Sequence, residues 1–310
     1  MAAVVQFEGD VAIVTGAGGG LGRSHALELA RRGARVVVND VAGERADAVA
    51  EEIRGAGGEA VASSDSVADA AGAAALVATA LESFGALYVL VNNAGVMING
   101  LIEDLTPEQL DTVLAVNLAG HFHPCRAAWP TMRAQGYGRI VMTCSAGGMF
   151  AMQGESNYAA SKGGVYGLTK ALAVEGRDDG ILVNALMPMA NTAMGTDDPV
   201  PGHAERYPAW VGAALRPIRT TEAVSPMVAL LASRDWKHTG EAYSVGFGRF
   251  ARVFVAETPG WNAPDPAAVT AEDVRDHLES VRDVDGYAIH ADIYEELEFI
   301  ARSVGVEPPA

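Results

Sequence analysis

The chain has 310 residues, of which 49% are hydrophobic and 20% charged, and its formal net charge is −17. This length suffices for one large α/β domain, and so strong a negative charge argues against nucleic acid or an anionic membrane as a partner. Only two cysteines, Cys125 and Cys144, are present, and we see neither a signal peptide nor a membrane-spanning run. We therefore expect a cytoplasmic protein without disulfides, and we predict no metal site.

Strand-like and helix-like segments alternate along most of the chain. Short apolar runs predict strands at 11–15, 35–40, 60–63, 87–91, 139–144, 181–186 and 242–245. Helical periodicity predicts helices near 21–32, 43–55, 67–84, 107–134, 156–177 and 221–233. Such alternation indicates an α/β fold with a doubly wound parallel sheet, which binds ligands at the carboxyl ends of its strands.

A glycine-rich segment separates the first strand from the first helix. It contains Gly16, Gly18, Gly19, Gly20 and Gly22. Glycines at this place allow a tight turn and close approach of the backbone, so that the helix N-terminus can receive a pyrophosphate. A plain glycine-rich turn is the alternative, but the strand before and the helix after favour a phosphate cradle.

Asp40 ends the second predicted strand, eighteen residues after Gly22. A carboxylate there can accept hydrogen bonds from an adenosine ribose and repel a 2′-phosphate. The position before Gly20 is Gly19, so no base at that position could hold a 2′-phosphate. Both observations favour NAD over NADP, although an aspartate that merely closes a turn would look the same.

Three residues provide acid–base chemistry. Tyr158 and Lys162 are four residues apart, one turn apart on a helix, and Ser145 stands thirteen positions before Tyr158. A nearby cation favours the tyrosinate, which makes the phenol a usable acid and base near neutral pH, and the serine hydroxyl can hold the same substrate oxygen. These groups suit proton transfer to and from a carbonyl or alcohol.

With Thr15-Gly-x-x-x-Gly20-x-Gly22, Asn92-Asn93-Ala94-Gly95, Ser145 and Tyr158-x-x-x-Lys162 in order, residues 7 to 248 resemble the short-chain dehydrogenase/reductase family. The resemblance implies a Rossmann-like domain, a nicotinamide cofactor and a homodimer or homotetramer. It implies catalytic roles for Asn117, Ser145, Tyr158 and Lys162, with a water held by Asn117. It implies cofactor contacts by Gly16, Gly20, Leu21, Gly22, Asp40, Asp65, Val67, Asn93, Ala94, Gly95, Tyr158, Lys162, Pro188 and Thr192.

Several of these positions have other interpretations. Read without the family, Asn117 is a helix-interior residue that bonds its neighbours, and Asp65 is a helix N-cap. After Pro188 the family usually has a glycine, whereas this chain has Met189, and Thr192 stands one position early. The assignment of Thr192 as a ligand of the nicotinamide carboxamide therefore depends on the resemblance alone.

A narrower resemblance is to the (3R)-hydroxyacyl-CoA dehydrogenase part of type 2 peroxisomal multifunctional enzymes, which also act on steroids. It is carried by scattered stretches such as residues 36–40, 126–129 and 137–143. It implies NAD-dependent interconversion of a secondary alcohol and a ketone in a 3-hydroxyacyl-CoA or steroid-type substrate. A broad-specificity carbonyl reductase or alcohol dehydrogenase shares every motif, and a non-catalytic NAD-binding regulator is the alternative of a different class.

Two regions break the alternation. Residues 189–218, with a possible short helix near 206–215, have the irregular composition of a substrate lid or of a surface loop. After the domain formed by residues 1–248, residues 249–310 form a predicted extension with a strand-like run at 250–256. Helices are expected there after Thr270, a plausible N-cap, and near 292–303. We expect this extension to pack on the body or on a neighbouring subunit, a disordered acidic tail being the alternative.

Overall fold

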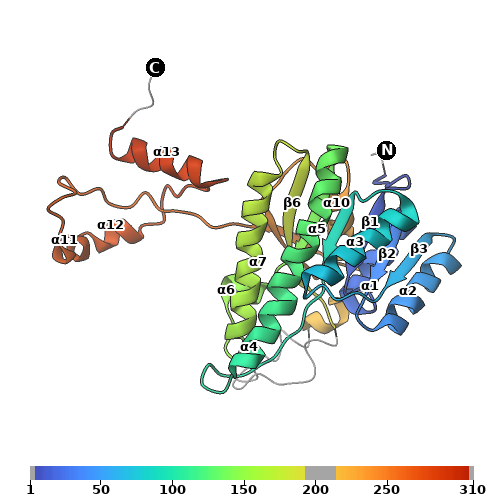
Figure 1. Ribbon diagram of the computed structural model, residues 1–310. Helices are drawn as coiled ribbons and strands as arrows, with labels where there is room; N and C mark the ends of the chain where they lie inside the picture. Colours follow the sequence, from blue (N-terminus) through green and yellow to red (C-terminus); the bar gives the residue numbers. More distant parts are fainter. Residues whose placement is uncertain (1–3, 193–213, 307–310) are drawn as a thin grey trace. The chain divides into compact units, whose positions relative to one another are not determined.

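The computed structural model describes residues 4–192 and 214–306 (Figure 1). The chain divides into two compact units, residues 1–252 and 253–310.

The larger unit is built on one eight-stranded sheet with the order β3-β2-β1-β4-β5-β6-β7-β8. All neighbouring strands from β3 to β7 are parallel, which confirms the predicted doubly wound sheet. The strands are β1 Val11–Thr15, β2 Arg35–Asn39, β3 Glu59–Ser63, β4 Val89–Asn92, β5 Gly138–Thr143, β6 Ile181–Met189, β7 Ala242–Gly246 and β8 Arg249–Val253.

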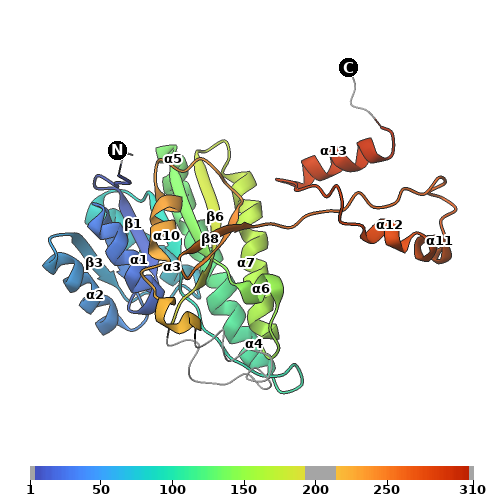
Figure 2. The ribbon, with the colours of Figure 1, turned by 180° about the vertical axis from the view of Figure 1, so that it is seen from behind.

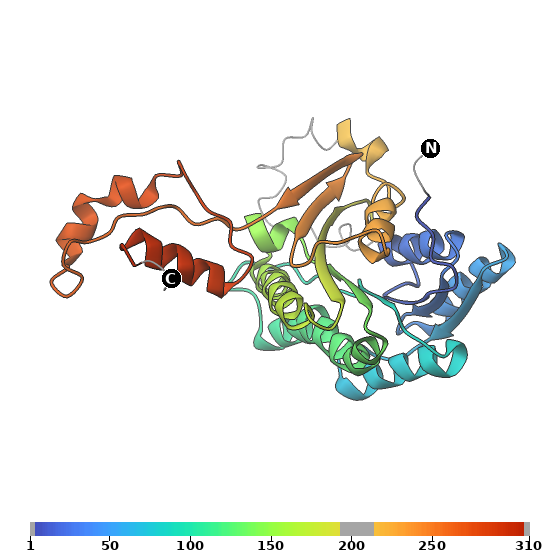
Figure 3. The same ribbon diagram turned by 90° about the horizontal axis from the view of Figure 1, so that it is seen from above.

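Helices cover both faces of this sheet. They are α1 Gly20–Arg31, α2 Gly43–Gly55, α3 Ala70–Phe84, α4 Pro107–Leu114, the π-helix η1 Ala115–Ala119, α5 Gly120–Gln135, α6 Ala146–Phe150, α7 Ser156–Glu175, the 3₁₀-helix η3 Arg216–Ile218 and α10 Ser225–Ala232. On one face α1 packs against α10 (Figure 2), and on the other α3 packs against α5. Figure 3 shows the sheet between these two layers.

The core follows from strands that are buried on both faces. β1, β4 and β5 have no exposed residue, and valine occurs in all three, as expected in a parallel sheet that helices cover. Apolar side chains of α1, α2 and α10 complete one side of this core. Because these strands are buried and parallel, their carboxyl ends lie side by side. The loops that follow them, which carry the polar residues, therefore meet at that edge of the sheet.

The last two strands form a hairpin. Only Phe247 and Gly248 separate β7 from β8, and their φ angles are 57° and 76°. Two consecutive residues in the left-handed region make a type I′ turn, which joins antiparallel strands. The strand-like run predicted at 250–256 thus begins one residue earlier and ends at Val253.

Three details of the helices differ from the sequence prediction. The helix expected from residue 67 begins at Ala70, because the Asp69 carboxylate accepts the Gly72 N–H at 2.8 Å. Asp69, and not Asp65, is therefore the N-cap, so that interpretation of Asp65 was wrong. The single helix expected over 107–134 is interrupted by the π-helix η1, which periodicity did not indicate. The short helix α6 was not expected either.

Most of the predicted lid, with the short helix expected near 206–215, lies outside the described residues. The two ends of this segment meet, because the Asn191 N–H donates to the Arg219 carbonyl at 2.9 Å. The lid therefore stays a prediction.

The smaller unit contains α11 Ala271–Asp276, α12 Leu278–Arg282 and α13 Ile293–Ser303. The predicted cap is present, since Thr270 and Asp273 form a capping box. Asp292 caps α13, and Trp261 stacks on His277 with ring centroids 4.0 Å apart. That this unit packs on the body or on another subunit stays a prediction.

Candidate active site

The glycine-rich loop forms a closely packed bend between β1 and α1. Gly16 and Gly20 have φ angles of 62° and 52°, which favour glycine. A Cβ on Gly22 would lie 2.2 Å from the Gly16 carbonyl oxygen, so only glycine fits there. The sequence thus specifies both the direction of the loop and its close packing.

Hydrogen bonds hold this bend against the end of β4. The Thr15 hydroxyl accepts the N–H groups of Asn93 and Ala94 at 2.9 and 3.0 Å, and the Asn93 amide donates to the Thr15 carbonyl at 2.9 Å. A Cβ on Gly16 would meet Ala94 Cα at 2.8 Å. The predicted residues Asn93 and Ala94 therefore support the loop from beneath, and Gly95 follows them.

The N-terminus of α1 is open to a ligand. Its N-cap Gly19 provides no side-chain cap, and a Cβ there would meet nothing within 4 Å. Free N–H groups and the positive end of the helix dipole attract a phosphate. The cradle therefore fits the diphosphate of a nicotinamide dinucleotide, which supplies the hydride acceptor or donor when bound.

Asp40 follows β2 directly and lies beside the loop. Its carboxylate accepts the N–H of Gly18 at 3.1 Å and the N–H of Ala42 at 2.9 Å. Arg45, an exposed residue of α2, lies next to it, because a Cβ on Gly18 would contact both side chains. The sequence analysis overlooked Arg45, whose separation from the glycine motif gave no signal.

The other predicted cofactor residues surround the same strand ends. The Asp65 carboxylate accepts the Ser63 hydroxyl at 2.9 Å, and Val67 is buried against Gly120. Leu21 lies in the first turn of α1, and Pro188 lies in β6, opposite Val245 of β7. Thr192 comes near the glycine loop, since a Cβ on Gly20 would lie 3.6 Å from its methyl carbon.

Ser145, Tyr158 and Lys162 meet beyond the end of β5. Ser145 caps α6, where its hydroxyl accepts the Gly147 N–H at 3.1 Å. Tyr158 and Lys162 are buried on α7, and the Lys162 ammonium lies 5.8 Å from the centre of the Tyr158 ring. The structure thus brings together the three residues for which the sequence predicts acid–base chemistry.

Burial dominates the acid strength of this pair. It raises the pKa of Tyr158 to about 12, against a hydrogen bond with Ser145 that lowers it. Burial lowers the pKa of Lys162 to about 8. Burial is the largest influence on the pKa of Tyr158 in this structure, and the expected activation by the lysine stays a prediction.

The backbone behind Lys162 fixes its ammonium group. Lys162 Nζ donates to the Thr143 carbonyl at 2.7 Å. His121 lies close by, and burial, with a smaller effect of the Lys162 charge, holds the pKa of His121 well below its usual range. A neutral histidine therefore stands beside the lysine, and the sequence analysis did not single it out.

Asn117 occupies the π-helix η1, fully buried. Its amide accepts the Val96 N–H at 2.8 Å and donates to the Val96 carbonyl at 2.9 Å and to Ser161 Oγ at 3.2 Å. The partners are 21 and 44 positions away in the sequence, so these contacts are not bonds within the helix; they join the loop after β4 to α7. The role of holding a water stays a prediction.

The family follows from direct comparison. The short chain dehydrogenase model matches residues 10–199. The chain therefore belongs to the short-chain dehydrogenase/reductase family, as its motifs indicate, and is an oxidoreductase of that kind.

Individual relatives refine this assignment. A short-chain type dehydrogenase/reductase of Mycobacterium tuberculosis is 42% identical over 288 residues, covering 90% of this chain and 96% of the relative. Peroxisomal multifunctional enzyme type 2 of Mus musculus is 40% identical over 297 residues, which cover 91% of this chain but only 38% of that enzyme. A crystal structure of a short chain dehydrogenase from Mycobacterium avium has a TM-score of 0.76 and 38% identity, covering 91% and 98% of the two chains. The narrower resemblance is thus confirmed.

Within residues 4–192 and 214–306, no group of three or more His, Cys, Asp or Glu side chains is placed to hold a metal ion. Among the described helices none is long and apolar enough to cross a membrane.

Proposed function

We propose that this protein is an NAD-dependent oxidoreductase that interconverts a secondary alcohol and a ketone. The observation that carries the proposal is the meeting of Ser145, Tyr158 and Lys162 beyond β5, in a sheet whose strand ends also carry the glycine cradle. A regulator that only binds NAD has no need for a buried tyrosine and lysine beside a serine.

The chain's own residues account for the proton transfer. Ser145 orients the substrate oxygen, and Tyr158 takes its proton during oxidation or returns it during reduction. Lys162, held by Thr143, places a positive charge near the phenol and so stabilises the tyrosinate as the proton leaves. The buried site excludes water and fixes the reacting geometry.

Asp40 supports the preference for NAD. Its carboxylate is tied to the loop that starts the phosphate cradle, where a 2′-phosphate would meet a negative charge. Arg45 beside it favours NADP. Asp40 accepts a hydrogen bond from the loop backbone whereas Arg45 is exposed, and we give Asp40 more weight.

An apolar substrate fits the surface near the site. Phe150 is 67% exposed, Met152 38% and Ile102 74%. The loop that carries Ile102 is joined to the segment after α6, because the Gly100 N–H donates to the Gly154 carbonyl at 2.9 Å. Such a surface supports a 3-hydroxyacyl-CoA or steroid-type substrate, as does the narrower resemblance. A broad-specificity carbonyl reductase or alcohol dehydrogenase is the alternative.

The test is NADH formation with a panel of substrates. It contains a (3R)- and a (3S)-hydroxyacyl-CoA, a 17β-hydroxysteroid and simple secondary alcohols. Turnover of the (3R)-thioester supports the proposal, whereas turnover of simple alcohols alone supports the alternative.

Tyr158→Phe separates an enzyme from a regulator. Without the phenol proton we expect turnover to fall about 10²- to 10⁴-fold, while NAD binding by fluorescence titration stays near that of the wild type. Absence of turnover in the wild type, together with intact NAD binding, would support the regulator.

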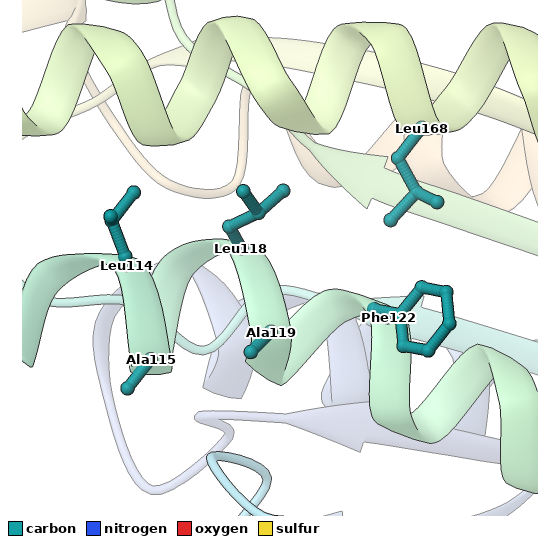
Figure 4. Close-up of a pocket in the computed structure, with 6 residues that line it drawn as sticks. All are labelled: Leu114, Ala115, Leu118, Ala119, Phe122 and Leu168. Atoms are coloured by element: carbon teal, nitrogen blue, oxygen red, sulfur yellow. The ribbon is translucent and has the colours of Figure 1, made fainter. Parts of the chain in front are cut away.

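Self-association is also part of the proposal. Figure 4 shows an apolar groove between α7 and the α4–η1–α5 helices, lined by Leu114, Ala115, Leu118, Ala119, Phe122 and Leu168. Phe122 is 45% exposed there. Two copies of this groove would bury apolar surface against each other, which supports a homodimer or homotetramer.

We keep the cytoplasm as the proposed compartment. Cys125 and Cys144 are buried and free, which suits a reducing environment. The names of several relatives place them in peroxisomes, which is the competing location.

A further inference from the structure

The short helix α6, which begins at the catalytic serine, has no apolar anchor of its own. It spans Ala146–Phe150, and none of these five residues is buried. The helix α7 beside it (Figure 1) has twenty residues, and many of them are buried. Apolar burial therefore holds α7 in the core but does not fix α6. Because Ser145 is the N-cap of α6, the contacts that hold α6 also help to place the Ser145 hydroxyl.

Gly148 brings the backbone of α6 onto the backbone of α7. A Cβ on Gly148 would lie 2.7 Å from Lys162 Cβ, and 2.8 Å from both the carbonyl carbon of Lys162 and the nitrogen of Gly163. The last two atoms belong to one peptide unit, which joins Lys162 to Gly163. A backbone unit inside a helix cannot swing aside as the end of a long side chain can. Only glycine therefore allows α6 to come this close to α7.

The residue before Ser145 contacts the same peptide unit. The thiol of Cys144 is buried and donates to the carbonyl oxygen of Lys162 at 3.1 Å. Cys144 and Gly148, on the two sides of Ser145, thus both rest on the Lys162–Gly163 peptide. Since this peptide belongs to α7, it ties the place of Ser145 to Tyr158 and Lys162 on the same helix.

We propose that Gly148 and Cys144 are positioning residues, which set the place of the Ser145 hydroxyl relative to the Tyr158 phenol by holding the serine segment on the Lys162–Gly163 peptide. This inference rests on the proposed function, in which Ser145 and Tyr158 hold the same substrate oxygen. Two groups that share one oxygen need accurate placement, because a displacement of about 1 Å can cost about 10²-fold in rate.

Gly148→Ala tests the proposal directly. An ordinary contact begins at 3.4 Å, so the new methyl group has to move away by about 0.6 Å. We expect α6 to yield and not α7, because α6 has no buried residue. With NAD and an alcohol that the wild type oxidises, kcat/KM should fall about 10- to 100-fold. The control Gly167→Ala lies on α7 at an exposed position where a Cβ meets nothing within 4 Å, and it should keep the wild-type kcat/KM.

A double-mutant cycle with Ser145→Ala separates positioning from a general loss of packing. Without the hydroxyl there is nothing left to misplace, so Gly148→Ala should lower the residual kcat/KM of Ser145→Ala less than about threefold. A merely structural role gives the same fold loss in both backgrounds. A crystal structure of Gly148→Ala decides the matter if Ser145→Ala has no measurable turnover. Ser145 Oγ should be displaced relative to Tyr158 and Lys162, and an Oγ that has not moved overturns the proposal.

Cys144 keeps the proposal testable if Gly148→Ala does not fold. Cys144→Ala removes one weak hydrogen bond to the Lys162 carbonyl and should lower kcat/KM about threefold. Cys144→Ser keeps a donor at the same place and should recover the wild-type value. If Gly148→Ala does not fold, an unchanged kcat/KM in Cys144→Ala, or equal losses in the two Cys144 variants, overturns the proposal.

The outcomes separate this inference from the proposed function. A wild-type protein that oxidises an alcohol, together with a Gly148→Ala variant of equal activity or with equal losses in the two backgrounds, overturns the positioning role and leaves the oxidoreductase intact. Absence of wild-type turnover with every alcohol of the panel overturns the proposed function, and this inference with it.

Discussion

The close packing around Gly22 can be tested by the substitution Gly22→Ala, which adds one methyl group to the glycine loop. In Gly22→Ala the new Cβ would lie 2.2 Å from the Gly16 oxygen and 2.6 Å from Asn93 Nδ2. Both contacts are far shorter than van der Waals distances, and the first is to backbone. Overpacking of this kind costs about 3 kcal/mol at the upper end of its usual range, and the better helix propensity of alanine returns about 1 kcal/mol. We therefore expect a net loss of about 2 kcal/mol.

Gly167→Ala is the matched control. Gly167 is an exposed residue inside α7, and a Cβ there meets nothing within 4 Å. Only the propensity effect acts, so this variant should gain up to about 1 kcal/mol. The assay is urea unfolding of both variants, with NAD affinity by fluorescence titration. Gly22→Ala should also bind NAD at least about tenfold more weakly, because its loop must move. Equal stability and equal affinity of the two variants would refute the reasoning.

Three further predictions concern the cofactor, the groove and the buried lysine. Asp40→Ala should reduce the preference for NAD over NADP about 10- to 100-fold in kcat/KM, since a charged hydrogen-bond acceptor is lost; an unchanged preference would point to Arg45 or to the loop backbone instead. Phe122→Glu places a charge in the apolar groove and should shift the protein to smaller species in analytical ultracentrifugation, whereas a wild-type protein already monomeric would contradict the proposed self-association. For Lys162, burial lowers the folded-state pKa to about 8 from 10.5, so the folded protein binds fewer protons than the unfolded chain between these values, and stability rises with pH there. Relative to Lys162→Met, the wild type should gain about 3 kcal/mol between pH 8 and 10.5 in urea unfolding, and parallel pH profiles would show that the lysine is not so strongly desolvated.

The strands of the sheet could be predicted from short apolar runs in the sequence, because these strands are buried on both faces. Runs such as Val11–Thr15 and Arg35–Asn39 contain at least three consecutive apolar residues and end where glycine or aspartate follows, so composition and length together predict their bounds. The first residue of α3 was predicted wrongly because the sequence offers two plausible N-caps, Asp65 and Asp69. Only the bond from the Gly72 N–H decides between them.

The site could be predicted only where its residues have fixed spacing. Tyr158 and Lys162 lie one turn apart on α7, so their geometry follows from the helical period. The glycines are close together in the sequence, between the end of β1 and the first turn of α1. Arg45 and His121 lie near these residues but belong to other elements. Their positions depend on how the helices pack on the sheet, which no short spacing records.

The same distinction explains why burial reverses part of the electrostatic reasoning. From the sequence, a lysine one turn from a tyrosine should lower the pKa of the phenol. In the folded chain both groups are desolvated, which raises the pKa of Tyr158 to about 12 and lowers that of Lys162 to about 8. Each shift opposes the charged form, so an ionised pair must be stabilised by whatever else enters the site. A substrate oxygen at Ser145 and a cofactor in the cradle would supply polar partners and exclude water at once. The Tyr158 phenol therefore stays neutral near pH 7, whereas Lys162, with a pKa of about 8, is still mostly protonated there.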